Sequence, residues 1–277
     1  MKHSQNQYYC YVCDSTDHRE VSRLHQKPKG ETDYGIPDSK YDRVITQCLH
    51  CTVYTNQHDL LSSAMYEGDY NASIALGDIR ERYDKVMNLA PEKSDNRQRV
   101  KRITDFLLSK NLALKDCDVL DVGSGTCVFL GALQEAGPRC ACVDPDPKAI
   151  AHAKEYVGIP LAHCGTLENF PTDNTFDLIT FNKVLEHVKD PVSMLQESGR
   201  LLKKDGFVYV ELPEGGRADQ QGIAAERQEF FVEHYTVFNE TSFHELAHRA
   251  GFEAHQLNII TEPSGKLTIY GFLSKKK

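Results

Sequence analysis

Four of the nine cysteines form two matching pairs near the amino end of the chain. Cys10 and Cys13 make the first Cys-x-x-Cys pair, and Cys48 and Cys51 make the second. Two such pairs supply the four thiolates of a closed tetrahedral zinc site, the common structural arrangement for this metal. The loop between the pairs is longer than usual, but its closure costs only about 0.6 kcal/mol more per doubling of length. We therefore predict a structural zinc site, with a redox pair or four free thiols as alternatives.

A second group of candidate residues follows a short apolar run, Val119 to Val122. Asp121 lies inside this predicted strand, and Gly123-Ser124-Gly125 follows it as a turn that only small residues form easily. Apolar residues then return at helical spacing from Val128. Strand, glycine turn and helix open a doubly wound nucleotide-binding fold, in which the ligand lies against the glycine backbone.

A second acid, Asp144, ends the next predicted strand about 20 residues beyond the glycine turn, where doubly wound folds place a carboxylate on ribose hydroxyls. Asp146 precedes Pro147, so we expect it to cap a helix. A standard dinucleotide fingerprint would need a third glycine at position 128, where this chain has Val128. The turn is therefore not that of a dinucleotide-binding protein.

The pattern around Asp121 resembles the first motif of class I S-adenosylmethionine methyltransferases. The segment Asn182–Pro191 resembles the fourth motif of that family, which usually ends Leu-Glu-His-Val-x-Asp-Pro. The chain departs from the family at Cys127, where a glycine is common, and at Thr166, where an acid often holds the adenine amino group. The resemblance implies nine cofactor-binding residues: Asp121, Gly123, Ser124, Gly125, Asp144, Pro145, Thr166, Leu167 and Asn182.

The segment Phe230–Phe238 resembles a branch of this family that also carries an N-terminal zinc ribbon. The branch includes sugar C-methyltransferases, in which a Glu-His pair and a tyrosine handle substrate protons. Glu233 and His234 match the pair, whereas Phe231 replaces the tyrosine, so work on a hydroxyl is favoured over work on carbon. The resemblance implies His234 as general base, oriented by Glu233, with a purely structural role of the pair as the alternative. His187 is a further candidate that commonly supports the cofactor pocket.

A literal His-Glu-x-x-His, the pattern of zinc proteases, runs from His244 to His248. Two histidines four residues apart share a helix face. The same stretch has the pattern of an amphipathic helix, with Phe243 and Leu246 toward the core and Gly251 as its stop. No third ligand follows at the protease spacing, so we interpret the stretch as a structural helix.

The composition excludes some functions. The chain has 277 residues, is 40% hydrophobic and carries a formal net charge of −8, which argues against binding a phosphate backbone. No apolar run approaches the length of a membrane span, and the first residues lack a signal-peptide pattern. Nine cysteines without a secretion signal indicate a reducing, cytoplasmic environment.

These elements predict an α/β protein: a Rossmann-like doubly wound methyltransferase sheet with an antiparallel end hairpin, plus a small zinc-ribbon lobe. The expected segments are the zinc-ribbon lobe at 1–60, a helical linker or lid at 61–110, and the cofactor-binding domain at 111–277. Tyr66 and Tyr70 lie between the lobes and are candidate substrate-binding residues, with simple packing as the alternative.

The predicted function is transfer of a methyl group from S-adenosylmethionine to a small polar acceptor, a hydroxyl of a sugar or nucleotide-linked sugar. One alternative is C- or N-methylation of a similar metabolite. Another is methylation of RNA or protein with the zinc ribbon as the recognition module, which the acidic charge disfavours. A third is a non-catalytic partner subunit that binds S-adenosylmethionine.

Overall fold

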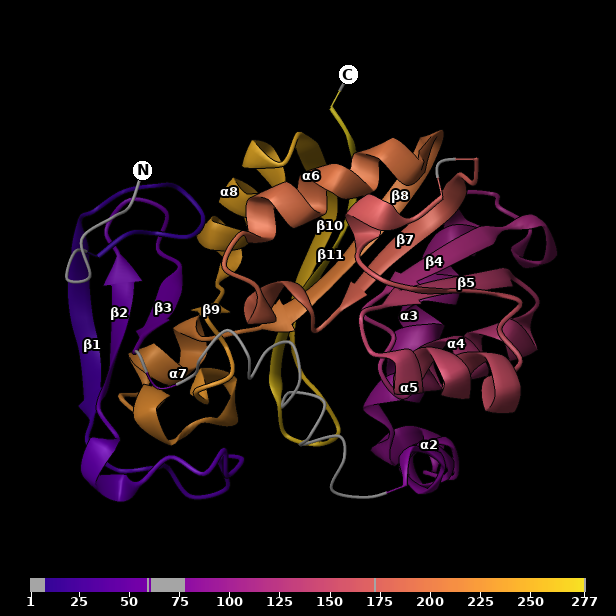
Figure 1. Ribbon diagram of the computed structural model, residues 1–277. Coiled ribbons are helices and arrows are strands. Elements are labelled where there is room, and N and C mark those ends of the chain that lie inside the picture. Colours follow the sequence, from indigo (N-terminus) through magenta and orange to yellow (C-terminus); the bar gives the residue numbers. More distant parts are fainter. Residues whose placement is uncertain (1–7, 59, 61–77, 172, 277) are drawn as a thin grey trace.

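Two sheets organise the computed structural model, which describes residues 8–58, 60, 78–171 and 173–276 (Figure 1). The larger sheet is flanked by helices, and the smaller one lies beside it and is built mainly from the amino end of the chain. Tyr66 and Tyr70 lie outside the described residues, so their predicted role stays a prediction.

The larger sheet has seven strands within the described residues. In spatial order they are β10 (Phe252–Thr261), β11 (Leu267–Lys275), β8 (Leu202–Pro213), β7 (Phe176–Asn182), β4 (Asp118–Val122), β5 (Arg139–Asp144) and β6 (Leu161–Cys164). The five strands β8, β7, β4, β5 and β6 are parallel to one another. Strand β11 is antiparallel to both β8 and β10. The predicted doubly wound sheet with an antiparallel end hairpin is confirmed.

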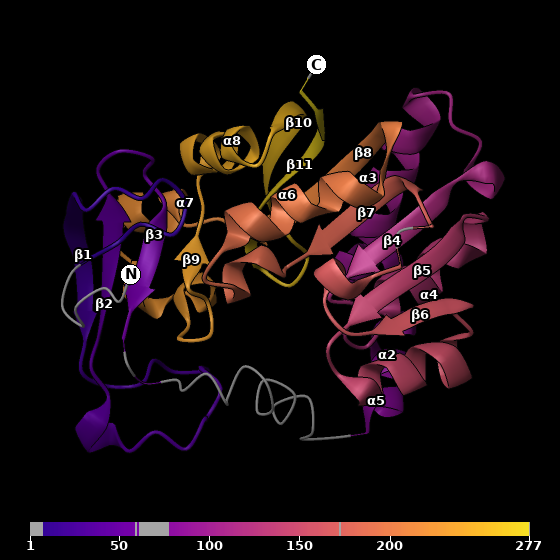
Figure 2. The same cartoon turned by 45° about the horizontal axis from the view of Figure 1, so that its top comes forward.

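Helices cover both faces of this sheet (Figure 2). One face carries α6 (Pro191–Leu201) and α8 (Glu240–Arg249), and the other carries α3 (Asp95–Ser109), α4 (Val128–Leu133) and α5 (Pro147–His152). On β7, Leu178 packs in the core beneath α3 and α4, while its neighbour Ile179 packs in the core beneath α6 and α8. A parallel strand covered on both faces needs apolar residues at successive positions, and β7 supplies them.

Side chains cap the helices at the cofactor edge. Asp146 accepts a hydrogen bond from the Lys148 amide at 2.8 Å and begins α5, as the sequence predicts. Asp190 accepts from the Ser193 amide at 2.9 Å and begins α6. Two other helices, α2 (Ile79–Met87) and α7 (Gly216–Gln220), complete the set that the figures label. In the parts of the chain that the structure describes, no helix is both long and apolar enough to cross a membrane.

The smaller sheet joins strands from the first 60 residues to a short strand late in the chain. It contains β1 (His18–Leu24), β2 (Arg43–Cys48), β3 (Tyr54–Gln57) and β9 (Thr236–Val237), all antiparallel. Tyr54 is paired with Val237, and Thr55 with Thr236. The lobe expected at 1–60 therefore shares its sheet with a strand from the segment expected to bind the cofactor.

A buried ionic network ties α3 to the middle of the large sheet. Glu211 on β8 is fully buried, and its carboxylate accepts from Arg99 at 2.5 and 2.9 Å, from Arg102 at 3.0 Å and from the Tyr209 hydroxyl at 2.7 Å. Burial alone would raise the pKa of Glu211, but the charges of Arg99, Lys183 and Arg102 together hold it well below its ordinary value. Glu211 therefore stays ionised inside the protein.

Replacing this carboxylate should destabilise the fold. Glu211→Gln removes the carboxylate that pairs with Arg99 and leaves Arg102 with Glu262 alone, and breaking a buried pair in this way costs about 3–5 kcal/mol of unfolding free energy. Urea unfolding followed by circular dichroism measures the change. Because the pKa of Glu211 is lowered on folding, its contribution is present above the ordinary value of 4.5 and is lost as the pH falls below it.

The control is Asp105→Asn, which breaks the exposed Lys101–Asp105 pair on the outer face of α3. Exposed pairs contribute little, so this variant should unfold like the parent protein. Equal unfolding midpoints for both variants would contradict the structural role of Glu211.

Candidate functional site

The carboxyl ends of β4 to β7 open into a cavity of about 610 Å³. Parallel strands place their carboxyl ends at one edge of a sheet, which is where open α/β folds bind ligands. All nine residues predicted to bind the cofactor line this cavity: Asp121, Gly123, Ser124, Gly125, Asp144, Pro145, Thr166, Leu167 and Asn182. The structure therefore brings together residues that are up to 61 positions apart.

Asp121 lies at the floor of the cavity and is 2% exposed. Its Oδ1 accepts from the Thr180 hydroxyl at 2.6 Å and from the Asn182 side-chain amide at 2.7 Å. Burial raises the pKa of Asp121 to about 7, against the opposing effect of these hydrogen bonds. Asn182 therefore acts through Asp121 as well as lining the cavity itself.

Asp144 closes the next side of the cavity. Its carboxylate accepts from the main-chain amides of Gly125 at 2.8 Å and Asp146 at 2.8 Å, and burial raises its pKa above the ordinary value. Gly123 and Gly125 have φ values of 70° and 50°, which favour glycine. A Cβ on Gly123 would lie 2.8 Å from the Val184 side chain, whereas one on Gly125 would enter open space. The turn is thus both tightly packed and open toward the cavity.

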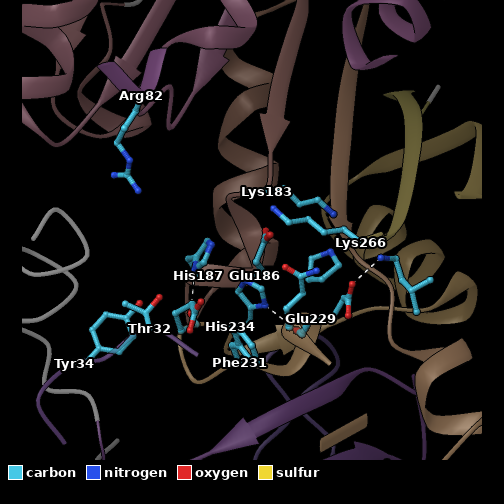
Figure 3. Close-up of a pocket in the computed structure, with 14 residues that line it drawn as sticks. Thr32, Tyr34, Arg82, Lys183, Glu186, His187, Glu229, Phe231, His234 and Lys266 are labelled. Atoms are coloured by element: carbon cyan, nitrogen blue, oxygen red, sulfur yellow. Dashed lines mark hydrogen bonds between the residues drawn. The ribbon is translucent and has the colours of Figure 1, made fainter. Parts of the chain in front are cut away.

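A second pocket of about 420 Å³ adjoins the first (Figure 3). Arg82, Lys183 and His187 line both cavities and form their common wall. The rest of the second pocket is mostly polar and includes Glu233 and His234, which with His187 are the three predicted catalytic residues. An acceptor held there would lie directly beside the larger cavity.

Main-chain carbonyls orient the two histidines of this pocket. His187 Nδ1 lies 3.0 Å from the Glu233 carbonyl, His234 Nδ1 lies 2.7 Å from the Glu229 carbonyl, and the ring centroids are 4.8 Å apart. Because a carbonyl oxygen only accepts, Nδ1 of each ring carries the proton and Nε2 carries the lone pair. His234 thus holds the tautomer that a general base needs.

The Glu229 carbonyl accepts from Nδ1 of His234, and the Glu233 carbonyl accepts from Nδ1 of His187. The expected orienting role of the Glu233 carboxylate stays a prediction. Burial lowers the pKa of His187 to about 4. Burial also lowers the pKa of His234 well below its ordinary value, and the nearby His187 and Lys183 lower it further. Burial also raises the pKa of Glu233 to about 7. Both imidazoles are therefore neutral at neutral pH.

Sequence reasoning missed two titratable residues in the same pocket, Lys183 and Glu186. Glu186 is fully buried, neither carboxylate oxygen has a hydrogen-bond partner among the described residues, and burial raises its pKa to about 7. Lys183 has a φ of 60°, donates from Nζ to the Thr268 hydroxyl at 2.9 Å, and has its pKa lowered by burial. Both residues lie inside the segment Asn182–Pro191, so the resemblance of this segment to the fourth motif was the sequence feature that could have identified them.

The outer side of the pocket comes from distant parts of the chain. Thr32 and Tyr34 reach it from the N-terminal lobe, and Lys266 reaches it from the turn before β11. The loop that carries Thr32 and Tyr34 is rich in glycine, proline and charged residues, so its sequence indicated only an exposed loop.

The four predicted metal-ligating cysteines converge in the N-terminal lobe. The sulfur atoms of Cys10, Cys13, Cys48 and Cys51 all lie within 4.8 Å of one another. Sγ of Cys10 is 3.5 Å from that of Cys51, and Sγ of Cys13 is 3.5 Å from that of Cys48. Main-chain amides of Cys13 and Cys51 point at sulfur, at 3.4 and 3.5 Å. Four clustered sulfurs with amide donors around them fit a tetrahedral metal ion.

The His-Glu-x-x-His stretch forms α8, as the amphipathic pattern predicts. Phe243 and Leu246 are buried, whereas His244 and His248 are exposed. Among the described residues, neither histidine belongs to a group of side chains that could hold a metal ion.

Comparisons with known proteins agree with this geometry. Residues 89–257, more than half of the chain, match the methyltransferase domain family. A ubiquinone biosynthesis O-methyltransferase of Actinobacillus pleuropneumoniae serotype 7 (strain AP76) is 34% identical over 116 residues, which is 38% of this chain and 49% of that protein. The chain thus spans about half the length of the curated relatives that it matches.

Two solved structures share the fold at low identity. One is the Burkholderia thailandensis 1,6-didemethyltoxoflavin-N1-methyltransferase with S-adenosylhomocysteine, at 17% identity and TM-score 0.57, covering 85% of this chain and 96% of that one. The other is the magnesium protoporphyrin IX methyltransferase of Synechocystis PCC 6803, also with S-adenosylhomocysteine, at 15% identity and TM-score 0.59, covering 78% and 100%. The glycine turn, the two acids at the strand ends and the family match all agree. This chain belongs to the class I S-adenosylmethionine-dependent methyltransferases.

Proposed function

We propose that this enzyme methylates a hydroxyl of a small polar acceptor, a sugar or nucleotide-linked sugar, with His234 as general base. The observation that carries the proposal is the shared wall between the two cavities. A methyl donor in the larger cavity and an acceptor in the smaller one would meet at Lys183 and His187. His234 lines the same smaller cavity as the acceptor.

The larger cavity fits S-adenosylmethionine, since it offers a buried acid at each of two strand ends and open space over Gly125. When bound, this group supplies a methyl on a cationic sulfonium that an acceptor oxygen attacks in line. Holding both reactants in a near-attack pose accounts for about 7–11 kcal/mol of barrier lowering. The chain contributes the two adjoining cavities that align them, and His234 Nε2 accepts the hydroxyl proton.

The lining of the smaller pocket supports a hydrophilic acceptor. Gln228, Lys183 and Lys266 offer hydrogen-bond donors, and the Glu186 carboxylate offers acceptors. The name of the A. pleuropneumoniae relative supports O-methylation, although the match covers only 38% of this chain. Phe231, which has no proton to exchange, lines the pocket where sugar C-methyltransferases have a tyrosine, and this supports a hydroxyl over carbon.

We also propose that the four-cysteine cluster holds a structural zinc ion. Three of its cysteines are buried and Cys13 is half-buried, and the residues that follow the second cysteine of each pair, Asp14 and Thr52, adopt φ values of 64° and 63°. A left-handed threonine is strained, and a metal that fixes both turns would offset that strain.

Removing the proposed base tests the central claim. His234→Ala should lower the rate of methyl transfer by about 10²–10⁴-fold, the usual contribution of a general base, while S-adenosylhomocysteine affinity stays within about threefold. The assay follows label from methyl-labelled S-adenosylmethionine into small-molecule, RNA and protein fractions of a cell extract. His244→Ala, an exposed histidine on α8, is the matched control and should behave like the parent.

Each other outcome of this assay changes the assignment. Label in the RNA or protein fraction would replace the small acceptor with a macromolecule. Full activity of His234→Ala would remove the general base from the mechanism. Cofactor binding without label in any fraction would favour a non-catalytic partner subunit.

The pH dependence should reflect a histidine that resists protonation. The pKa of His234 lies well below its ordinary value of 6.5, so the imidazole is still neutral at pH 6.5. We therefore expect kcat/KM to remain level as the pH falls to 6.5 and to decrease only at lower pH. Initial rates across this range provide the measurement. If kcat/KM instead changes near pH 7 in the parent protein and this change disappears in Glu186→Gln, the pH dependence belongs to Glu186.

Metal analysis tests the zinc site. The purified protein should contain about one zinc ion per chain by mass spectrometry, and Cys13→Ser should lose it and unfold at a lower temperature. Cys164→Ser changes an exposed cysteine outside the cluster and is the control. A stable metal-free protein with a disulfide among these cysteines would favour the redox alternative.

A further inference from the structure

The segment 229–235, which carries Glu233 and His234, is held on two sides. Toward the large sheet, the Tyr235 amide donates to the Glu186 carbonyl at 2.8 Å, and His187 donates to the Glu233 carbonyl. Toward the small sheet, its contacts come from the N-terminal lobe. The path of this segment matters for chemistry because its own Glu229 and Glu233 carbonyls set the two histidine rings.

Asn56 on β3 is the central contact from the N-terminal lobe. Its Nδ2 lies 2.7 Å from the His234 carbonyl, 3.2 Å from that of Phe231 and 3.3 Å from that of Phe230. Its main-chain amide donates to the Tyr235 carbonyl at 3.1 Å. The side chain is 3% exposed, so water does not replace these donors if they are removed.

Arg43 and Glu31 fix the direction of the Asn56 amide. Arg43 Nη1 donates to Asn56 Oδ1 at 2.7 Å and also to the Phe230 carbonyl, so Nδ2 must face the segment. Arg43 Nη2 lies 3.0 Å from Glu31 Oε1, which accepts from the Val232 amide at 2.8 Å. Both side chains of this ion pair are fully buried. A buried pair with satisfied hydrogen bonds gives a rigid support rather than a variable one.

We propose that Asn56 is a positioning residue for catalysis. Through the carbonyls on either side of Glu233 it fixes the path of 229–235, and through the Glu229 and Glu233 carbonyls it fixes the tautomer and direction of His234 and His187. The inference rests on the proposed role of His234 as general base. In this proposal the N-terminal lobe shapes the acceptor pocket, and it need not recognise RNA or protein.

Asn56→Asp tests the inference, because it keeps the oxygen that accepts from Arg43 and removes the Nδ2 donors. The matched control is Gln47→Glu, the same change on β2 of the same lobe, where the amide donates to the Thr52 carbonyl instead. Three measurements are made on the full-length proteins: S-adenosylhomocysteine titration, kcat and KM by label transfer to the small-molecule fraction, and histidine ring ¹⁵N shifts by NMR.

Asn56→Asp should lower kcat by about 10–100-fold, the cost of a small misplacement of a reacting group, with cofactor affinity within about threefold. The His234 ring should exchange between tautomers, whereas in Gln47→Glu it should stay protonated on Nδ1. A kcat within about twofold of the parent, together with a fixed ring, would overturn the proposal.

Two provisions keep this test decisive. If Asn56→Asp does not fold, Tyr41→Phe removes the hydroxyl that links Glu31 and Arg43, and should give the same loss of kcat and ring exchange at smaller size. If the parent protein labels no small molecule, the proposed function fails, but the ring shifts still decide whether Asn56 positions His234.

Discussion

One buried carboxylate, Glu211, is linked to residues that line both cavities. Its two arginines come from α3, and its main-chain carbonyl accepts from the Lys183 amide at 3.0 Å. Arg99 lines the larger cavity and Lys183 lines both. Because an unpaired charge in the interior is costly, α3 cannot move from β8 without a large loss of stability. Arg99 and Lys183, which line the cavities, are therefore both held to β8 through Glu211.

The two cavities are built on different principles. The larger one is made mainly of the strand ends of one sheet and the glycine turn, with Arg82, Val86, Arg99 and Met194 added from helices. The smaller one combines residues 32–34, 82, 183–187, 213, 228–234 and 266–267, so it draws on six separate parts of the chain. If the smaller pocket holds the acceptor, as proposed, substitutions in its loops would change the acceptor without disturbing cofactor binding, which is how one fold serves many reactions.

The sequence was sufficient to predict the larger cavity, because its signals are local. Asp121, the glycine turn and Asp144 each follow a strand, and parallel strands align their ends. It did not predict Thr32, Tyr34 or Lys266, which reach the pocket only through tertiary contacts. It did not predict that the main-chain carbonyl of Glu229 accepts from His234, since no residue type signals which carbonyl faces a ring. The Glu211–Arg99 contact was hidden for the same reason, because nothing local marks a pair 112 positions apart.

The pairing of β3 with β9 has a consequence for the order of assembly during synthesis. The N-terminal lobe leaves the ribosome first, yet its sheet is completed by Thr236 and Val237, near the other end of the chain. Until those residues arrive, β3 presents an open edge that can pair with another chain. Such long-range closure is slow compared with local helix formation. Truncated or stalled chains of this protein should therefore be prone to association through the N-terminal lobe.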